Sequence, residues 1–254
     1  MKAELNKIIN ILYEDNDILA INKPAGLVVH SDGRTQEPSI VDWVEENYPS
    51  TKGVGEPTVM ASGEVIDRSG IVHRLDRETS GVMLIAKTTK GHEELKKQFQ
   101  DRTIKKKYLT FVHGDMKDDF GIINKPIGKS PADFRKWSAT RGAKGEMREA
   151  ETWWTRLSFK DGVSFLLIEP KTGRTHQIRV HMKAVNHPVV SDKLYAREKP
   201  QALGFNRTAL HAWSIIFINC EGKKITVKAP IPPDFINAIK ELNIEDIAKK
   251  EGIC

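Results

Sequence analysis

The spacing of apolar and polar residues along the 254-residue chain alternates between two periods, and each period predicts one kind of element. Alternation every second residue and short apolar runs predict strands over residues 8–13, 18–22, 27–30, 82–86, 104–112, 151–159, 163–169, 209–219 and 224–228. Spacings of three and four predict helices over residues 39–48, 89–101 and 175–185, with a last helix opening at Pro232. The dipeptide Asp161-Gly162 makes strands 151–159 and 163–169 the clearest hairpin.

Two stretches interrupt this pattern with Gly, Pro and polar residues, over 49–70 and 114–148, and both are predicted to be mostly loop. Long loops in compact proteins often carry function. Because the strands come in hairpin pairs and the helices are interspersed among them, the sequence predicts an α+β fold with a mostly antiparallel, mixed sheet. A doubly wound parallel sheet would need strict alternation of strands and helices.

Composition narrows the choice of compartment and partner. Lys and Arg number 40 against 34 Asp and Glu, a net charge of +6, which permits an anionic partner that binds locally. The two cysteines, Cys220 and Cys254, form no disulfide framework or metal-ligand pattern, which favours a reducing compartment. Neither an apolar signal core nor a run of about 20 apolar residues is present. We therefore expect a cytoplasmic protein, and, without a long apolar surface stripe, a monomer.

The first chemical candidate is the run His73-Arg74-Leu75-Asp76-Arg77-Glu78-Thr79-Ser80-Gly81, which lies between a predicted loop and a strand. An aspartate between arginines is most often a structural ion pair. Its place on a loop beside a rigid strand favours a functional site instead, and Gly81 allows close passage of the backbone. The residues alone leave both interpretations open.

The second candidate is the run from Lys171 to His181, in which a Gly-containing turn meets a predicted helix N-terminus that Thr175 could cap. Such a terminus favours anions such as phosphate. The simpler alternative is a helix with a polar exposed side. A metal site of His176, His181 and His187 has no recognised ligand spacing, and we expect no metal.

Two further runs are less specific. Four cations within Arg102–Lys107 stand beside Tyr108, an arrangement suited to an RNA backbone and a stacked base, although a charged strand edge would look the same. The run from Asn22 to His30 contains no chemical signature of its own. No Gly-rich phosphate loop or serine-nucleophile elbow is present, so the common nucleotide-binding and hydrolase classes lose support.

In this order, the runs resemble the RluA-type pseudouridine synthases from Ile18 to about Pro230, with Ile71–Gly81 as the most specific element. Supporting segments are Asn22–His30, Lys107-Tyr108-Leu109 with Gly114, Thr172–His181 and Leu210-His211-Ala212. The resemblance implies one catalytic domain over residues 1–254, without the N-terminal RNA-binding domain of some relatives. Its sheet would have two halves with a central catalytic cleft, and helices packed around it.

The resemblance also implies an activity and its residues: isomerisation of uridine to pseudouridine in structured RNA, with no cofactor. Asp76 matches the catalytic aspartate, Tyr108 the tyrosine beside the target base, and Arg179 the basic partner of the aspartate. The base must leave its stack to be reached. Arg74 matches the arginine that fills the space of the flipped nucleotide. We expect RNA contacts from Arg74, Arg77, Lys105, Lys106, Arg174, His176 and Gln177.

The sequence departs from the family pattern at three places. Ser191 precedes Asp192 where glycine is usual, Ser31 follows His30 where proline is common, and residues 137–149 are unusual in detail. These departures leave the RNA uncertain: transfer RNA, large-subunit ribosomal RNA or both. A non-catalytic RNA-binding protein and a metal-dependent hydrolase are the alternatives in other functional classes.

Overall fold

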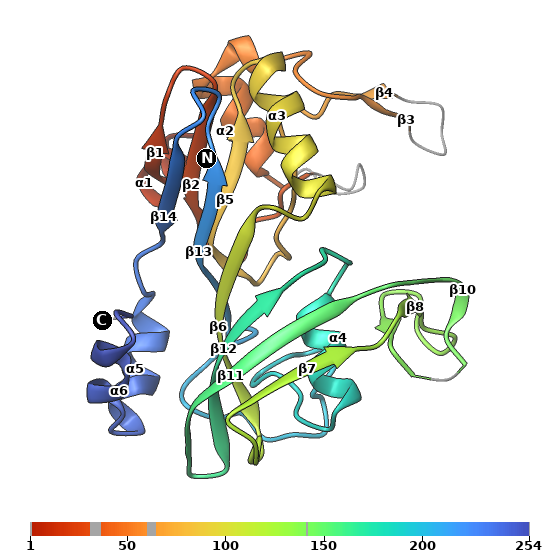
Figure 1. Ribbon diagram of the computed structural model, residues 1–254, viewed down its shortest axis with the longest axis vertical. Helices are drawn as coiled ribbons and strands as arrows, with labels where there is room; N and C mark the ends of the chain where they lie inside the picture. The colour runs from red at the N-terminus through yellow and green to blue at the C-terminus, as the bar shows by residue number, and fades with distance from the viewer. Residues whose placement is uncertain (1, 31–36, 60–64, 141, 254) are drawn as a thin grey trace. The chain divides into compact units, whose positions relative to one another are not determined.

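The computed structural model describes residues 2–30, 37–59, 65–140 and 142–253 (Figure 1). The chain forms two compact units. Unit 1 comprises Met1–Lys105 and Ser214–Pro230, and unit 2 comprises Lys106–Trp213 and Ile231–Cys254. Each unit therefore combines two separate segments of the sequence. The predicted catalytic cleft and single domain stay predictions.

Unit 1 is built on an antiparallel sheet whose central strands are buried. Its elements are α1 (Lys2–Ile8), β1 (Asn10–Glu14), β2 (Ile18–Lys23), α2 (Ile40–Asn47), the 3-10 turn η1 (Pro49–Thr51), β3 (Thr58–Val59), β4 (Val65–Ile66), β5 (Ser80–Ala86), α3 (Thr89–Gln100) and β14 (Lys224–Lys228). Strand β2 pairs antiparallel with both β1 and β5. Every residue of β5 is buried, which explains its continuous apolar run.

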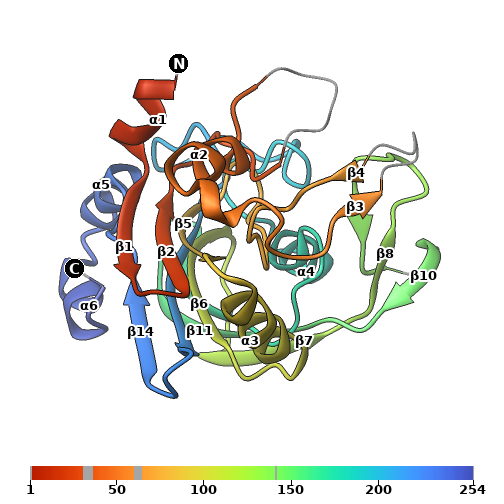
Figure 2. The same ribbon diagram turned by 90° about the horizontal axis from the view of Figure 1, so that it is seen from above.

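Side-chain caps fix where the helices of unit 1 begin. Ser39 and Asp42 form a reciprocal capping box at the start of α2, and the Thr88 hydroxyl accepts the N–H of Gly91 at the start of α3. Helix α1 lies next to α2 (Figure 2), where the Trp43 indole donates to Asn6 Oδ1 at 2.7 Å. Helix α3 lies beside β5 (Figures 1 and 2).

Unit 2 contains a larger antiparallel sheet in the order β6-β12-β11-β7. Its elements are β6 (Lys105–His113), β7 (Phe120–Asn124), β8 (Ile127–Lys129), β9 (Trp137–Ser138), β10 (Lys144–Arg148), β11 (Glu151–Lys160), β12 (Val163–Pro170), α4 (Gln177–Ala184), α5 (Pro233–Glu241) and α6 (Glu245–Lys250). A small sheet has the order β10-β8-β9. Strand β13 (Leu210–Ile218) begins in unit 2 and ends in unit 1.

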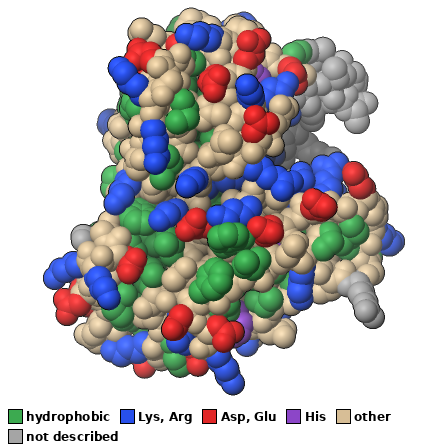
Figure 3. Space-filling model, in the orientation of Figure 1, with side chains coloured by type: hydrophobic (Ala, Val, Ile, Leu, Met, Phe, Trp, Pro, Cys, Tyr) green, Lys and Arg blue, Asp and Glu red, His purple; other side chains and the backbone are tan. Residues whose placement is uncertain are grey.

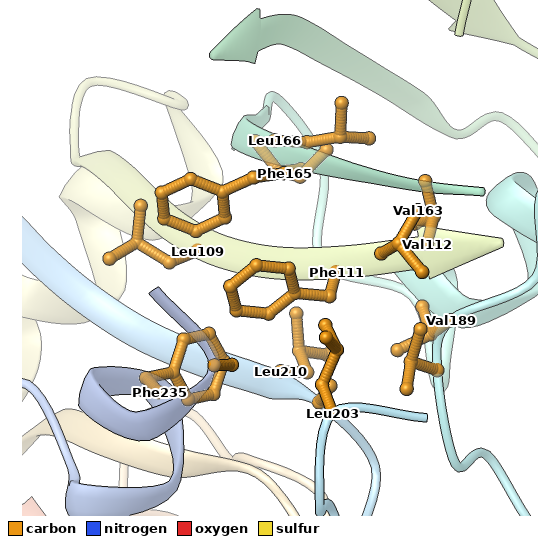
Figure 4. Close-up of a cluster of buried hydrophobic side chains, with 14 of the residues drawn as sticks. Leu109, Phe111, Val112, Val163, Phe165, Leu166, Val189, Leu203, Leu210 and Phe235 are labelled. Carbon is orange, nitrogen blue, oxygen red and sulfur yellow. The ribbon is translucent and has the colours of Figure 1, made fainter. Parts of the chain in front are cut away.

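An aromatic cluster forms the core of unit 2. Phe111 of β6 stacks on Phe165 of β12 with ring centroids 4.6 Å apart, and Phe235 of α5 approaches Phe111 at 5.4 Å (Figure 4). All three side chains are fully buried. Burial contributes about 1.5–3 kcal/mol for each such side chain, so the C-terminal helix is fixed by unit 2 rather than by its sequence neighbours in unit 1.

The surface carries charged side chains of both signs, together with some exposed apolar side chains. Figure 3 shows Lys and Arg mixed with Asp and Glu on both units, and apolar side chains gathered on the face of unit 2 that carries β7 and β11. Phe120, Ile122, Trp153 and Phe159 are the exposed large apolar residues of these two strands. No helix in the described ranges is long and apolar enough to cross a membrane.

Most predicted elements are confirmed, including the α+β class, the mostly antiparallel sheet and both hairpins. Four local predictions are wrong. Helix α1 occupies the start of the predicted strand 8–13, and residues 27–30 make only one isolated bridge, Val28 to Ser39. The predicted loop 114–148 contains β7, β8, β9 and β10. Helix α4 begins at Gln177 after His176, not at a Thr175 cap.

Candidate active site

Asp76 lies in unit 1, in the irregular segment that leads into β5. Its side chain is half-buried, and its carbonyl accepts the N–H of Thr79 at 3.1 Å. The hydroxyl-bearing residues Thr79 and Ser80 are buried, whereas Arg74 and Arg77 are more exposed. The segment therefore presents charged side chains outward while its main chain enters the sheet.

A buried lysine fixes the main chain beside Asp76. Lys23, at the end of β2, is fully buried, and its ammonium donates to the carbonyls of Pro24, Leu27 and Arg77 at 2.7, 2.7 and 3.1 Å. The Arg77 carbonyl also accepts the N–H of Gly26 at 2.8 Å. The run from Asn22 to His30, which lacked a chemical signature in the sequence, is thus joined to the residue following Asp76.

Histidines and arginines surround this segment. His73 Nε2 accepts the N–H of Leu84 at 2.9 Å, and its ring lies 4.8 Å from that of Phe99. Burial, together with the positive charges of Arg68 and Arg74, lowers the pKa of His30 to about 4. Arg77 forms an exposed ion pair with Glu37. His30 is therefore neutral at physiological pH, and the local excess of positive charge favours an anion.

Tyr108 lies in unit 2 on β6, where it pairs with Ile168 of β12 and is half-buried. Lys106 is two residues earlier and so shares its face of the strand. The Lys106 ammonium donates to the Thr172 carbonyl at 3.3 Å, and burial lowers the pKa of Lys106 to about 8. Lys105 is exposed on the other face.

Arg179 lies in α4 and is almost fully buried. Its Nε and Nη2 donate to the two carboxylate oxygens of Asp192 at 2.7 and 2.8 Å, with side chains only 7% and 0% exposed. The Tyr195 ring lies 5.1 Å from the guanidinium carbon. Sequence reasoning named Arg179 but assigned no role to Asp192 or Tyr195, because partners this far along the chain leave no local pattern.

The other residues of α4 are also buried from Gln177 to Met182, which counts against the alternative of a helix with a polar exposed side. The Gln177 amide donates to the Glu151 carbonyl and the Thr152 hydroxyl, and accepts from the Thr172 hydroxyl and the Arg174 N–H. Arg174 is half-buried and donates to the Glu149 carbonyl. The RNA contacts expected of Gln177 and Arg174 stay predictions.

His176 precedes α4 with φ 55°, in the left-handed region, and its Nδ1 lies 2.9 Å from the Tyr195 hydroxyl. His181 Nε2 donates to the Lys125 carbonyl and its Nδ1 accepts from the Thr152 hydroxyl, both at 2.9 Å. Among the residues that the structure describes, no group of three His, Cys, Asp or Glu could hold a metal. Both ring nitrogens of His181 are engaged, which removes support for the hydrolase alternative.

Ser191, the departure beside Asp192, has φ 56°, a conformation that glycine adopts without strain. Its hydroxyl donates to the Phe205 carbonyl at 2.9 Å. The turn thus keeps the conformation expected of glycine. Ser31 and residue 141 of the third departure lie outside the described residues.

Comparison with known proteins decides the family. Residues 17–184 match the family model described as RNA pseudouridylate synthase. The chain belongs to this family. An uncharacterized RNA pseudouridine synthase of Synechocystis sp. is 38% identical over 228 residues, which cover 89% of this chain and 67% of that protein. The resemblance to RluA-type synthases is confirmed by the ribosomal large subunit pseudouridine synthase D of Neisseria meningitidis, 34% identical over 93% of this chain and 62% of that protein.

Solved structures support the same fold. The human RNA pseudouridylate synthase domain containing 4 matches with a TM-score of 0.71 at 24% identity, covering 95% of both chains. The human domain containing 1 matches with a TM-score of 0.66, covering 88% of this chain and 84% of that one. This chain is therefore an RNA pseudouridine synthase, an isomerase of uridine in RNA.

Proposed function

We propose that Asp76 is the catalytic carboxylate of this synthase. Pseudouridine formation breaks the bond between uracil N1 and ribose C1′, rotates the base and joins C5 to C1′; the C5 proton is lost and N1 gains a proton. In this scheme the carboxylate acts as nucleophile toward the ribose or the base, and the bond that it forms breaks again before the product leaves, which restores the free carboxylate. Family membership supports the proposal, together with the place of Asp76 in the segment most specific to the resemblance.

Tyr108 and Arg179 complete the proposed catalytic set. A half-buried tyrosine offers a flat surface that tolerates rotation of the uracil ring. Arg179 is proposed as the basic partner of Asp76, the role that the resemblance implies for it, and its guanidinium carries a permanent positive charge. Base flipping is part of the proposal, because a stacked uridine is out of reach of any side chain.

The proposed substrate is structured RNA of the ribosomal large subunit, with transfer RNA as the alternative. Support comes from the relatives named ribosomal large subunit pseudouridine synthase D. We assign RNA contacts to Arg74, Arg77, Lys105, Lys106, Arg174, His176 and Gln177, and substrate choice to residues 49–70 and 114–148. We further propose that the protein acts as a monomer in the cytoplasm, without cofactor or metal.

The test replaces Asp76 with alanine. Asp76→Ala should leave no detectable pseudouridine formation, while circular dichroism and the Kd for RNA stay close to wild type. Glu78→Gln is the matched control, since it removes a carboxylate charge from the same segment and should retain activity. Activity of Asp76→Ala above background would overturn the proposal.

Mapping of pseudouridines identifies the RNA. Total RNA is compared from cells with the wild-type chain, with Asp76→Ala and without the protein. Pseudouridines that are missing both in cells with Asp76→Ala and in cells without the protein mark the substrate sites. Their location distinguishes large-subunit ribosomal RNA from transfer RNA. Absence of any lost site, with salt-dependent RNA binding intact, would favour the non-catalytic alternative.

A further inference from the structure

We propose that Asp192 and Tyr195 are positioning residues for Arg179, and that Tyr195 connects Arg179 to the arm, defined as the described residues 127–140 and 142–148 with strands β8, β9 and β10. The proposal rests on the role proposed above for Arg179. It adds two residues outside the assigned site, and a route by which the arm influences that site.

The first step is the geometry of the Arg179–Asp192 pair. The Asp192 carboxylate accepts two parallel hydrogen bonds from Nε and Nη2 of Arg179, which form one edge of the planar guanidinium. Such a bidentate pair fixes both the position and the plane of the guanidinium. Rotation about the last side-chain bonds of Arg179 would break both hydrogen bonds in a buried place.

The second step is that Asp192 is itself held by main chain. Its Oδ1 accepts the N–H groups of Leu194 and Tyr195 at 2.9 and 3.1 Å, and the residue is only 1% exposed. The carboxylate is therefore oriented by the turn that carries it. This turn follows Ser191, whose left-handed conformation allows the chain to reverse.

The third step connects Tyr195 to the arm. The Tyr195 hydroxyl accepts the N–H of Trp137 in β9 at 2.9 Å and lies 2.9 Å from His176 Nδ1, to which it can donate. Its ring is buried with Ile127 of β8 and Val180 of α4. One side chain thus contacts both the arm and the Arg179 guanidinium.

The arm has the composition of an RNA-contacting element. Phe134 is 83% exposed, and the Lys129 ammonium lies 4.4 Å from the Trp137 ring. Lys136 and Lys144 are further cations of the arm, and Arg135 and Arg148 pair there with the carboxylates of Asp133 and Glu146. Because Trp137 belongs to this element and also donates to Tyr195, RNA bound at the arm would favour the arrangement that holds Arg179.

Unit 2 offers a matched control in a second bidentate pair, which is part-buried. Arg207 Nε and Nη2 donate to the two oxygens of Asp234 at 2.6 and 3.0 Å, and its guanidinium lies 5.7 Å from the Phe235 ring. Arg207 also donates to the carbonyls of Thr208 and Leu210. The bidentate pairing is the same, although the Asp234 side chain is 26% exposed, and no catalytic role is assigned to this pair.

The experiment compares Asp192→Asn, Tyr195→Phe and Asp234→Asn with wild type and Arg179→Ala in the full chain. The assay follows steady-state pseudouridine formation in a transcript of the mapped substrate. Asp192→Asn should lower kcat by about 10²-fold, the effect of misplacing a catalytic group by about 1 Å, with little change in KM. Tyr195→Phe, which keeps the ring, should lower kcat less. Asp234→Asn should lower Tm and leave kcat unchanged.

A double variant distinguishes action through Arg179 from general damage. If Asp192 acts only through Arg179, Asp192→Asn should lower kcat no further in the Arg179→Ala background. Wild-type kcat in both Asp192→Asn and Tyr195→Phe, with Arg179→Ala impaired, would overturn this inference and leave the proposed function intact. Wild-type kcat in Arg179→Ala would overturn the role of Arg179 itself. Tyr195→Phe decides the matter if Asp192→Asn does not fold.

Discussion

The two segments that carry the candidate residues are fixed in opposite ways. In unit 1 the segment around Asp76 is held through main-chain groups, which converge on the single buried ammonium of Lys23. In unit 2 helix α4 is held through its own side chains, because Gln177, Arg179 and His181 all bond to fixed partners. The same fold thus positions a carboxylate by its backbone and a guanidinium by its side chain.

This difference determines how each unit should respond to substitution. Loss of Lys23 releases carbonyls that shape a loop, so the expected result is lower stability of unit 1. Loss of Asp192 releases one catalytic candidate, so the expected result is lower kcat. The free energy of unfolding of Lys23 variants and the kcat of Asp192 variants therefore test this difference between the two units.

The largest stability effect is expected for Lys23→Met. The substitution removes the charged donor from the buried Leu27 carbonyl and from the part-buried carbonyls of Pro24 and Arg77, which should lower the free energy of unfolding by about 3 kcal/mol. Urea denaturation of the full chain measures it. Lys96→Met is the control, since Lys96 pairs with the exposed Glu56 in solvent and its loss should change stability little. Equal effects of the two variants would contradict the assigned role of Lys23.

Lys23 also shows what the sequence could not reveal. The partners of its ammonium are main-chain carbonyls, which every residue has, so no pattern of residue types marks the contact. Asp76, Tyr108 and Arg179 were identified through resemblance to a family, not through their surroundings. Asp192 was noticed only as the neighbour of Ser191, because its contact with Arg179 depends on the path of the chain between them.

The elements were predictable where burial leaves an apolar pattern in the sequence. Strand β5 is buried throughout and has a continuous apolar run, whereas β11 of the β11-β12 hairpin buries alternate residues at its start, and both were found. The arm and its neighbour β7 were missed for the opposite reason. All residues of β10 are exposed, and β7 buries one residue in five, Ile123, so apolar alternation never develops there. A short exposed strand lacks the alternation of apolar and polar residues that predicts a strand, so its sequence predicts a loop instead.

A smaller loss of stability is expected when the pH is lowered. Burial lowers the pKa of His30 in unit 1 to about 4 and also lowers that of His181 in unit 2. The unfolded chain then binds more protons below its ordinary histidine pKa of about 6.5, so stability is complete above about pH 6.5 and falls as the pH drops from there. For His30 alone the loss by about pH 5 is at most about 2 kcal/mol.

Glutamine variants test this dependence in each unit separately. His30→Gln and His181→Gln should each lose less stability than wild type between about pH 7.5 and pH 5, as measured by urea denaturation at both values. In His181→Gln the side-chain amide could still donate to the Lys125 carbonyl and accept from the Thr152 hydroxyl, so the fold of α4 should survive. A wild-type slope in both variants would show that other groups cause the pH dependence.

The smallest effect is expected at Ser191, next to the carboxylate that holds Arg179. Ser191→Gly relieves the left-handed conformation, worth about 1 kcal/mol, but loses the hydrogen bond to the Phe205 carbonyl, also worth about 1 kcal/mol. Its stability should therefore lie close to wild type. Ser191→Ala loses the hydrogen bond and keeps the strain, so it should be about 1 kcal/mol less stable than Ser191→Gly in thermal denaturation. Equal stability of the two variants would mean that the turn relaxes out of the left-handed region, and kcat of Ser191→Ala would then report whether Asp192 moves with it.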